Sequence, residues 1–249
     1  MCYHASVNAT FQQVEASYAK TFVEGSLPLF SNKSDVIAYH HNGFNFPKMP
    51  VITSDLNDKL QLFNWGLIPS WVKDFEAAKQ LRAQTLNARS ESVFEKASFK
   101  NPILSSRCLI PMTGFFEWKE ETDKSKVPYH IQLKNQAMFS MAGICSKWWS
   151  EAEAKEYQTF SILTTAANSL MEEIHNVKKR MPLILAKEQE ELWLNKNLGQ
   201  IEIEAFLKPF PSEQMEAFTI SPIISSRSKF KNSPEVLKPY SYEKRDLFS

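Results

Sequence analysis

The sequence predicts a single α+β domain with a mainly antiparallel sheet. In the middle of the chain, segments typical of strands outnumber segments with helical spacing, and the two kinds do not alternate regularly. The 249 residues include only 6 glycines and contain neither a GxGxxG nor a GxxxxGK[ST] loop. A doubly wound parallel sheet that binds a nucleotide is therefore not expected.

Helices are expected before, between and after the strands. The first spans residues 8–24, where Thr10 and Gln13 have the spacing of a capping box. A second spans residues 72–83, and a third starts from Ser90 as the N-cap of the segment SESVFEKA. Shorter helices are expected later in the chain, at residues 166–175, 187–195 and 201–208.

Strands are expected mostly after residue 105. The segment KLQLFNWGLIPSW, residues 59–71, comes earlier and reads as a strand that runs into a Pro-Ser turn. The later strands are rich in β-branched and aromatic residues and cover residues 114–120, 127–133, 138–148 and 157–165, with RMPLIL at 180–185 as a buried strand. We expect Trp65, Cys108 and Cys145 in the core and His40-His41 on the surface.

Composition narrows the class of protein. The net charge of +1 does not indicate a nucleic-acid partner, so any anion site must be a local patch. No stretch approaches the roughly 18 apolar residues of a membrane span, and we expect no membrane partner. Three cysteines, at positions 2, 108 and 145, do not form a disulfide framework, so we expect the reducing cytoplasm. Cys2 and His4 lack partners at zinc-ligand spacing, and we expect neither a metal nor a cofactor.

The chain opens MCYH, which places a cysteine directly after the initiator methionine. Because Cys2 is small, an aminopeptidase can remove Met1. The mature chain then begins with an α-amine and a thiol on adjacent carbons, a pair that no internal residue offers. The alternative is that Cys2 has no function beyond occupying the second position.

Two polar residues lie in apolar surroundings. Glu117 in GFFEWK sits among Phe and Trp, which would raise the pKa of its carboxyl and suit a general acid or base. The alternative is an edge strand with Glu117 facing water. His175 in EEIHNVKKRMPLIL is expected at a helix C-terminus, where the helix dipole favours the charged imidazole. It could equally be a helix-end cation without another role.

Polar and aromatic motifs suggest contacts with nucleic acid. Asn87 and Arg89 in NARSES lie where a loop enters a helix, a place that holds anions, although an ordinary cap and a surface salt bridge are the alternative. Trp71 in NWGLIPSW and Pro47 in GFNFPKMP belong to aromatic and proline-rich segments. Such residues can stack on unpaired bases, but they are more often core residues.

The order of these motifs resembles the SOS response-associated peptidase (SRAP) family. The resemblance rests on MC, WGLIPSW, NARSESV, RCLIPMTGFFEWK, TTAAN and IH…RMPLIL, and it covers residues 1 to about 232. It implies one SRAP domain over residues 1–235, with a barrel-like β core flanked by short helices, and a C-terminal tail over residues 236–249. For the oligomeric state, a monomer is the simplest expectation.

The resemblance implies that the protein recognises abasic sites in single-stranded DNA and crosslinks to them through Cys2. The α-amine has a reference pKa of about 8, against about 10.4 for lysine, so part of it is unprotonated at neutral pH. The unprotonated amine can attack the open-chain aldehyde of the abasic sugar and form a Schiff base. The thiol then closes a five-membered thiazolidine. A lysine or an internal cysteine could not close that ring, and the ring would protect the DNA strand from β-elimination.

The resemblance also gives roles to matching positions. It implies that Glu117 carries the proton, that His175 helps to open the sugar ring, and that Asn87 orients the N-terminus or the sugar. Arg89 would bind phosphate, and Trp71 and Pro47 would stack on or wedge against flanking bases. Further DNA contacts are expected from Lys178, Arg180 and His4.

Two departures from the family pattern affect these expectations. The family usually opens MCGR, so Tyr3 and His4 replace a glycine and an arginine, which puts a phosphate contact from His4 in question. The usual HDRMP is replaced by the longer HNVKKRMP, which leaves open whether Lys178 or Arg180 takes the family arginine's place.

Two other functions remain open. One is a peptidase or amidase that uses an N-terminal cysteine nucleophile, including self-cleavage confined to Met1. The other is a non-covalent reader of single-stranded or modified DNA, which would bind in a salt-sensitive way without needing Cys2. For a DNA-processing protein we expect a cytoplasmic location, in association with the nucleoid.

Overall fold

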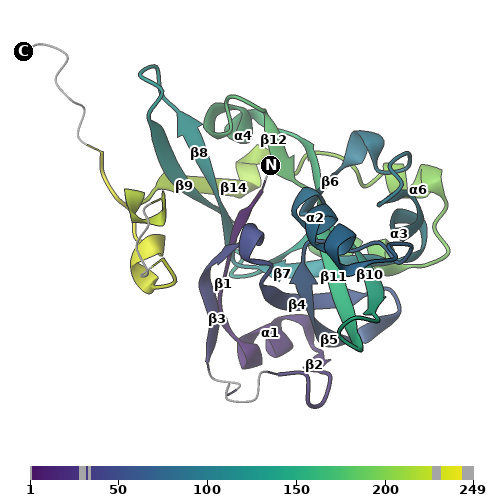
Figure 1. Cartoon of the computed structure of the whole chain (residues 1–249). Helices are drawn as coiled ribbons and strands as arrows, with labels where there is room; N and C mark the ends of the chain where they lie inside the picture. Colours follow the sequence, from purple (N-terminus) through teal and green to yellow (C-terminus); the bar gives the residue numbers. More distant parts are fainter. Residues whose placement is uncertain (1, 28–31, 33–34, 226–230, 243–249) are drawn as a thin grey trace, which may run out of the picture.

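Two sheets wrap around one hydrophobic core to form a barrel-like β structure with short helices at its periphery (Figure 1). The structure is a computed structural model that describes residues 2–27, 32, 35–225 and 231–242. Antiparallel pairs dominate both sheets, which confirms the α+β prediction. No helix among the described residues is long and apolar enough to cross a membrane.

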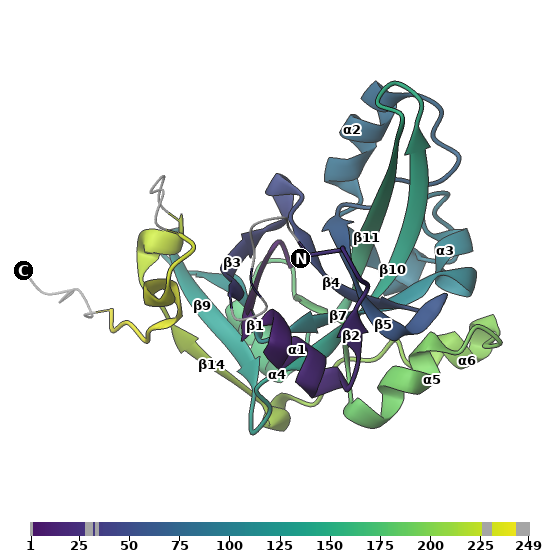
Figure 2. The ribbon, with the colours of Figure 1, turned by 90° about the horizontal axis from the view of Figure 1, so that it is seen from below.

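The first sheet holds the N-terminal strand in its interior. Its strands, in spatial order, are β14 (Met215–Thr219), β9 (Lys126–Leu133), β8 (Gly114–Glu120), β1 (His4–Thr10) and β3 (Val36–Asn42). Strand β1 is antiparallel to both neighbours, and His4 lies opposite Phe116 of β8. This register brings the start of the chain alongside Glu117, near the middle of the molecule (Figure 2).

The second sheet supplies more of the core than the first sheet does. Its main path runs through β12 (Arg180–Pro182), β11 (Lys155–Ala166), β10 (Phe139–Ser150), β7 (Arg107–Met112), β4 (Lys48–Thr53), β5 (Leu56–Trp65) and β2 (Thr21–Phe22). Two short strands join it, β6 (Asn87–Arg89) on β11 and β13 (Ile184–Leu185) on β10. Trp65, Cys108 and Cys145 are buried in this core, as predicted.

The helices are shorter than their sequence patterns predict. They are α1 (Phe11–Tyr18), α2 (Phe75–Gln84), α3 (Lys100–Ser105), α4 (Ser169–Ile174), α5 (Glu190–Leu194) and α6 (Gln200–Glu204). The predicted capping box of Thr10 and Gln13 is present at the start of α1. That helix ends early because Ala19 adopts a left-handed conformation with φ 51°, and Phe22 then pairs in β2.

The helix predicted from Ser90 is wrong. Asn87 to Arg89 form strand β6, which pairs in parallel with Ile162 to Thr164 of β11. After this strand the chain makes only a 3-10 turn, Ser90–Ser92, and no side chain caps it. Sheet pairing of the backbone therefore prevails over the local capping signal of Ser90.

The expected surface position of His40-His41 is also wrong. Both histidines lie in β3 and are buried, and His40 contacts both strand β1, through His4, and the C-terminal segment, through Asn232. The His4 Nδ1 and His40 Nε2 atoms are 2.8 Å apart, and the two rings are stacked. A pair of histidines that looks polar in the sequence is thus part of the packing beside the N-terminus.

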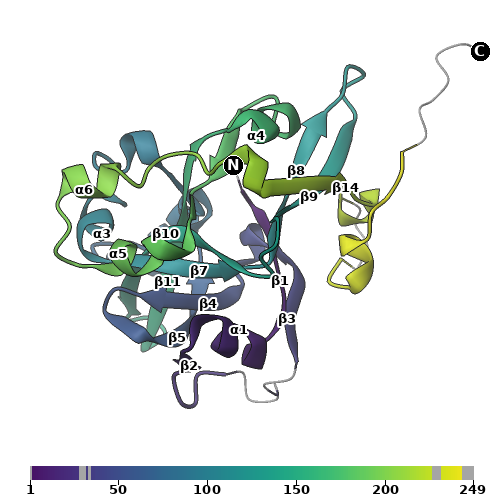
Figure 3. The ribbon, with the colours of Figure 1, turned by 180° about the vertical axis from the view of Figure 1, so that it is seen from behind.

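The described C-terminal segment, residues 231–242, folds back on the first sheet (Figure 3). We predicted a tail from residue 236, yet Val236 is fully buried in a cluster with Phe116, Ile220 and Ile224. Tyr240 also donates its N–H to the Thr219 carbonyl. Residues 243–249 of the predicted tail lie outside the described residues.

Candidate active site

Cys2 is buried where strand β1 begins. Its side chain is 0% exposed, and its thiol donates to the His4 carbonyl oxygen at 3.6 Å. Burial, followed by the nearby Glu117 carboxyl, raises the pKa of this thiol well above its usual range. The thiol therefore stays protonated at neutral pH. Met1 and its predicted removal lie outside the described residues.

Asn87 holds the backbone of Cys2 in place. Its side-chain amide donates to the Cys2 carbonyl oxygen at 2.9 Å, across 85 positions of sequence. Strand β6 makes this possible because its pairing with β11 fixes the Asn87 backbone. The Asn87 Oδ1 atom is buried and has no hydrogen-bond partner among the described residues, so it remains available to a group that enters the site.

Glu117 lies on an interior strand. Because β8 is flanked by β9 and β1, the alternative of a water-facing edge is wrong, and Glu117 is only 5% exposed. Burial raises the pKa of its carboxyl to about 7. Near neutral pH this group can therefore both donate and accept a proton, as the sequence predicts.

His175 faces Glu117 from the end of helix α4. Its position as the C-cap residue confirms the predicted helix end, and its Nε2 atom is 3.9 Å from Glu117 Oε2. Its Nδ1 atom is 2.8 Å from the Arg180 carbonyl oxygen and 3.3 Å from the Arg180 backbone nitrogen. The shorter contact favours the tautomer with the proton on Nδ1, in which the Nε2 lone pair faces the carboxyl. Burial lowers the pKa of His175 to about 4. Desolvation thus outweighs the helix dipole, which we expected to favour the charged ring.

Asn176 fixes this arrangement. Its side-chain amide donates to the Glu120 carbonyl at 2.8 Å and accepts from the Glu120 N–H at 3.1 Å. These two bonds tie the residue after His175 to the end of β8. The carboxyl and imidazole, 58 positions apart in sequence, are therefore held together by backbone-directed hydrogen bonds rather than by their own contact alone.

A cleft of about 510 Å³ opens onto the carboxyl–imidazole pair. It is lined by Tyr3, His4, Glu117, Trp118, Glu120, Lys126, His175, Val177, Lys178, Ile224, Ser225 and Lys231. Three lysines from different parts of the chain thus surround a buried proton donor. This combination suits a ligand that carries negative charge and reacts through proton transfer.

Only some of the residues predicted to contact DNA line the cleft. Lys178 and His4 line the cleft. Arg180 points elsewhere, because its guanidinium pairs with Glu91 and donates to the Thr164 carbonyl. Arg89 is exposed on β6, and its charge acts on the Tyr3 hydroxyl, which indicates that it lies near the N-terminus.

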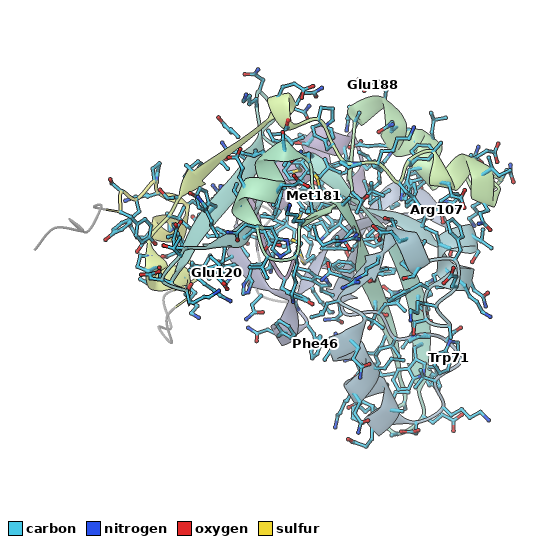
Figure 4. The ribbon with its side chains drawn as sticks, turned by 90° about the horizontal axis from the view of Figure 1, so that it is seen from above. Phe46, Trp71, Arg107, Glu120, Met181 and Glu188 are labelled. Atoms are coloured by element: carbon cyan, nitrogen blue, oxygen red, sulfur yellow. The ribbon has the colours of Figure 1, made fainter. Side chains whose placement is uncertain are left out.

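Trp71 and Pro47 do not line the cleft. Trp71 is 55% exposed and borders a separate hollow of about 530 Å³ beside α2. Figure 4 shows it on the far side of Phe46 from Glu120. Pro47 is half-buried, and its carbonyl accepts from Trp65 N–H at 2.9 Å. Base contacts from these two residues would therefore have to lie outside the cleft.

Several cleft residues were missed from the sequence: Tyr3, Trp118, Lys126 and Lys231. Trp118 could have been predicted as a site residue, because it directly follows Glu117 in the sequence. Tyr3 likewise adjoins Cys2 and His4. Lys126 and Lys231 come to the cleft through long-range packing, for which local patterns gave no signal. Among the described residues, no group of three or more His, Cys, Asp or Glu side chains could hold a metal ion.

The fold and the site define a protein in which Cys2 lies near a buried carboxyl–imidazole pair, and a basic cleft opens onto that pair. Residues 1–227 match the model of the SOS response associated peptidase (SRAP) family, and the chain belongs to this family.

Relatives and solved structures agree with this assignment. The chain is 35% identical over 232 residues to the abasic site processing protein YoqW of Bacillus subtilis, covering 87% of this chain and 99% of that one. It is 30% identical over 216 residues to mouse abasic site processing protein HMCES, covering 75% and 58%. A crystal structure of a Bacteroides thetaiotaomicron protein superposes with a TM-score of 0.88 at 43% identity, covering 96% and 100%.

Proposed function

We propose that the protein, after loss of Met1, attaches covalently to abasic sites in single-stranded DNA through Cys2. The observation that carries this proposal is the position of Cys2, whose backbone is held by Asn87 beside the Glu117–His175 pair. The relatives named as abasic site processing proteins support the choice of substrate. One chain suffices for one lesion, so we propose a monomer that acts in the cytoplasm at the nucleoid.

The proposed reaction joins the aminothiol to the sugar aldehyde with loss of one water. The Cys2 α-amine adds to the aldehyde carbon to give a carbinolamine. Protonation of its hydroxyl by Glu117 releases water and leaves an iminium ion. The thiol sulfur then adds to the iminium carbon, and its proton returns to the Glu117 carboxylate. The product is a thiazolidine, and Glu117 is restored.

The carboxyl–imidazole pair suits this sequence of steps. A carboxyl with a pKa of about 7 is partly protonated at neutral pH and can serve first as the acid and then as the base. The neutral His175 offers a lone pair at Nε2 that can accept a proton as the sugar ring opens. General acid–base groups of this kind contribute about 10²- to 10⁴-fold in rate.

The remaining roles concern binding. We propose that Asn87 orients the N-terminus and offers its free carbonyl oxygen to the amine or the sugar. Arg89 and Lys178 are proposed to contact phosphates near the lesion. Pro47 and Trp71 remain proposed contacts for flanking bases, at the distance from the cleft described above.

The test is crosslinking of the purified protein to single-stranded DNA that carries one abasic site, read by denaturing electrophoresis. Cys2→Ala should abolish the heat-stable adduct, and Glu117→Gln should slow its formation by about 10²-fold or more. Cys145→Ser and Glu190→Gln, which alter a buried cysteine and a buried glutamate outside the cleft, should form adduct at the normal rate.

Intact-mass measurement of the adduct completes the test. The mass should equal the chain without Met1 plus the DNA, minus one water. A heat-stable adduct with Cys2→Ala, or an adduct that retains Met1, would show the proposed mechanism to be wrong.

A further inference from the structure

The C-terminal segment, residues 231–242, contributes Lys231 to one wall of the cleft. Lys231 lines the cleft together with Ile224 and Ser225, and the other two lining lysines come from β9 and from the turn after α4. The family match ends at residue 227, before this segment. The cleft therefore includes a cation that the family model does not cover.

Asn232 anchors this segment to the edge of the first sheet. Its Oδ1 atom accepts from the N–H groups of Tyr39 at 2.7 Å and His40 at 3.2 Å. The register of β3 against β1 shifts at this point, and such a bulge can turn two successive N–H groups to the same side. Because Asn232 directly follows Lys231, these bonds fix where Lys231 enters the wall.

Apolar packing holds the same segment from its other end. Val236 is 0% exposed and packs in a cluster with Phe116, Ile220 and Ile224. Phe116 directly precedes Glu117 in β8, so the segment packs against the strand that carries the buried carboxyl. Lys231 is thus placed by a folded part of the molecule and not by a loose chain end.

The charge on this wall comes from Lys231 rather than from the histidines. Burial, together with the neighbouring His40 and Lys231, lowers the pKa of His4 to about 3, so its ring is neutral at pH 7. Two carboxyl groups line the cleft, but Glu117, with its pKa of about 7, carries only part of a negative charge at neutral pH, and Glu120 pairs with Lys124 at 3.1 Å. Lys126, Lys178 and Lys231 then give the cleft a positive balance.

We propose that Lys231 binds a backbone phosphate of single-stranded DNA and that the C-terminal segment is a functional wall of the DNA site. A lysine on a cleft wall can neutralise one phosphodiester as a point charge, without base specificity. This inference rests on the proposed function only in taking single-stranded DNA as the ligand. It does not depend on the covalent step.

The test measures the salt dependence of binding to an undamaged single-stranded oligonucleotide by fluorescence anisotropy. Each phosphate neutralised in single-stranded DNA contributes about 0.7 to the slope of log K against log salt. Lys231→Ala should reduce that slope by about 0.7 and weaken binding several-fold at low salt, whereas Lys231→Arg should keep both near the normal values. Lys238→Ala is the matched control, because Lys238 lies on the same segment but pairs with Glu235 at 2.7 Å away from the cleft.

An unchanged slope and affinity in Lys231→Ala, or equal losses in Lys231→Ala and Lys238→Ala, would overturn the proposal. Thermal unfolding of each variant checks that the fold is intact. The proposed function is judged separately by the adduct with abasic DNA at saturating concentration, which Lys231→Ala should still form. A protein that binds DNA through Lys231 but forms no adduct would uphold this inference and reject the covalent mechanism.

Discussion

At the scale of single residues, Glu117 couples the site to the stability of the fold. Its carboxyl has a pKa near 7 in the folded protein and about 4.5 as the reference value, because burial disfavours the charge. The folded state therefore holds more protons than the unfolded state between pH 4.5 and 7. Stability from this group is fully present below pH 4.5 and is lost as pH rises to 7.

This linkage predicts how Glu117→Gln behaves. Glutamine mimics the neutral carboxyl at every pH, so the variant should gain stability relative to the natural protein as pH rises from 4.5 to 7. The full difference is about 3 kcal/mol, at about 1.4 kcal/mol for each pH unit. Urea unfolding at several pH values measures this difference in the free energy of unfolding. A difference that does not change with pH would contradict a Glu117 pKa near 7.

His175 acts in the opposite direction over part of this range. Its pKa is lowered from 6.5 to about 4, so the unfolded state binds the extra proton and stability rises with pH across that window. The two contributions partly cancel between pH 4.5 and 6.5 in the natural protein. The comparison with Glu117→Gln is therefore more informative than the pH profile of the natural protein alone.

The sequence predicted which residues belong to the site better than it predicted the contacts that bring them together. Local patterns identified Glu117 as a carboxyl among aromatics and His175 as a helix-end residue. They could not show that β8 is an interior strand, because its neighbour β1 is distant in sequence, at the N-terminal end of the chain. For the same reason His40 was assigned to the surface and Lys231 was missed, since both depend on contacts across more than 30 residues.

At the scale of elements, Arg107 attaches helices α3 and α5 to strand β7. Its guanidinium is fully buried and donates to the carbonyls of Trp193 at 2.8 Å, Ile103 at 2.8 Å and Leu104 at 2.9 Å, and also to Asn195. These oxygens lie at the C-terminal ends of the two helices, where carbonyls lack partners within the helix. A single cation thus satisfies both helix ends.

Replacement of Arg107 should therefore be costly. Arg107→Met would leave four buried carbonyls without their donor and should lower the free energy of unfolding by about 3–5 kcal/mol. Arg107→Lys retains the charge but not the planar fork, and should lose an intermediate amount. Urea denaturation measures both, and a loss under about 1 kcal/mol in Arg107→Met would show that water replaces these bonds without cost.

Local sequence patterns predicted where helix α1 begins but not where it ends. The capping box at Thr10 correctly marked the start of α1, because it depends on neighbouring residues only. The end of that helix, and the absence of a helix after Ser90, follow from sheet pairing of β2 with β5 and of β6 with β11. Short strands of two or three residues gain their stability from such pairing and have little signature of their own.

At the scale of the whole molecule, the C-terminal segment is part of the packing of the first sheet. A chain that ends after Tyr242 keeps the whole of this segment and is the reference for truncation. A chain that ends after Ser225 would expose Ile220 and Ile224 and remove Val236 from their cluster. At about 1.5–3 kcal/mol for each fully buried side chain, it should be destabilised by several kcal/mol.

Calorimetry of the two truncated chains checks this prediction. Lys238→Ala in the full chain serves as a control, because it alters an exposed residue of the same segment. Equal melting temperatures for the two truncated chains would show that the segment packs on the sheet without stabilising it.

The interior position of β1 also sets a schedule for maturation. The strand is synthesised first, but its partner β8 is complete only once residue 120 has been made, which takes roughly 6 to 24 seconds at normal rates of translation. Until then the first residues are open to a processing enzyme on the ribosome. Afterwards the sheet encloses the Cys2 side chain, so a freshly made chain exposes its thiol to reagents that the folded chain keeps out.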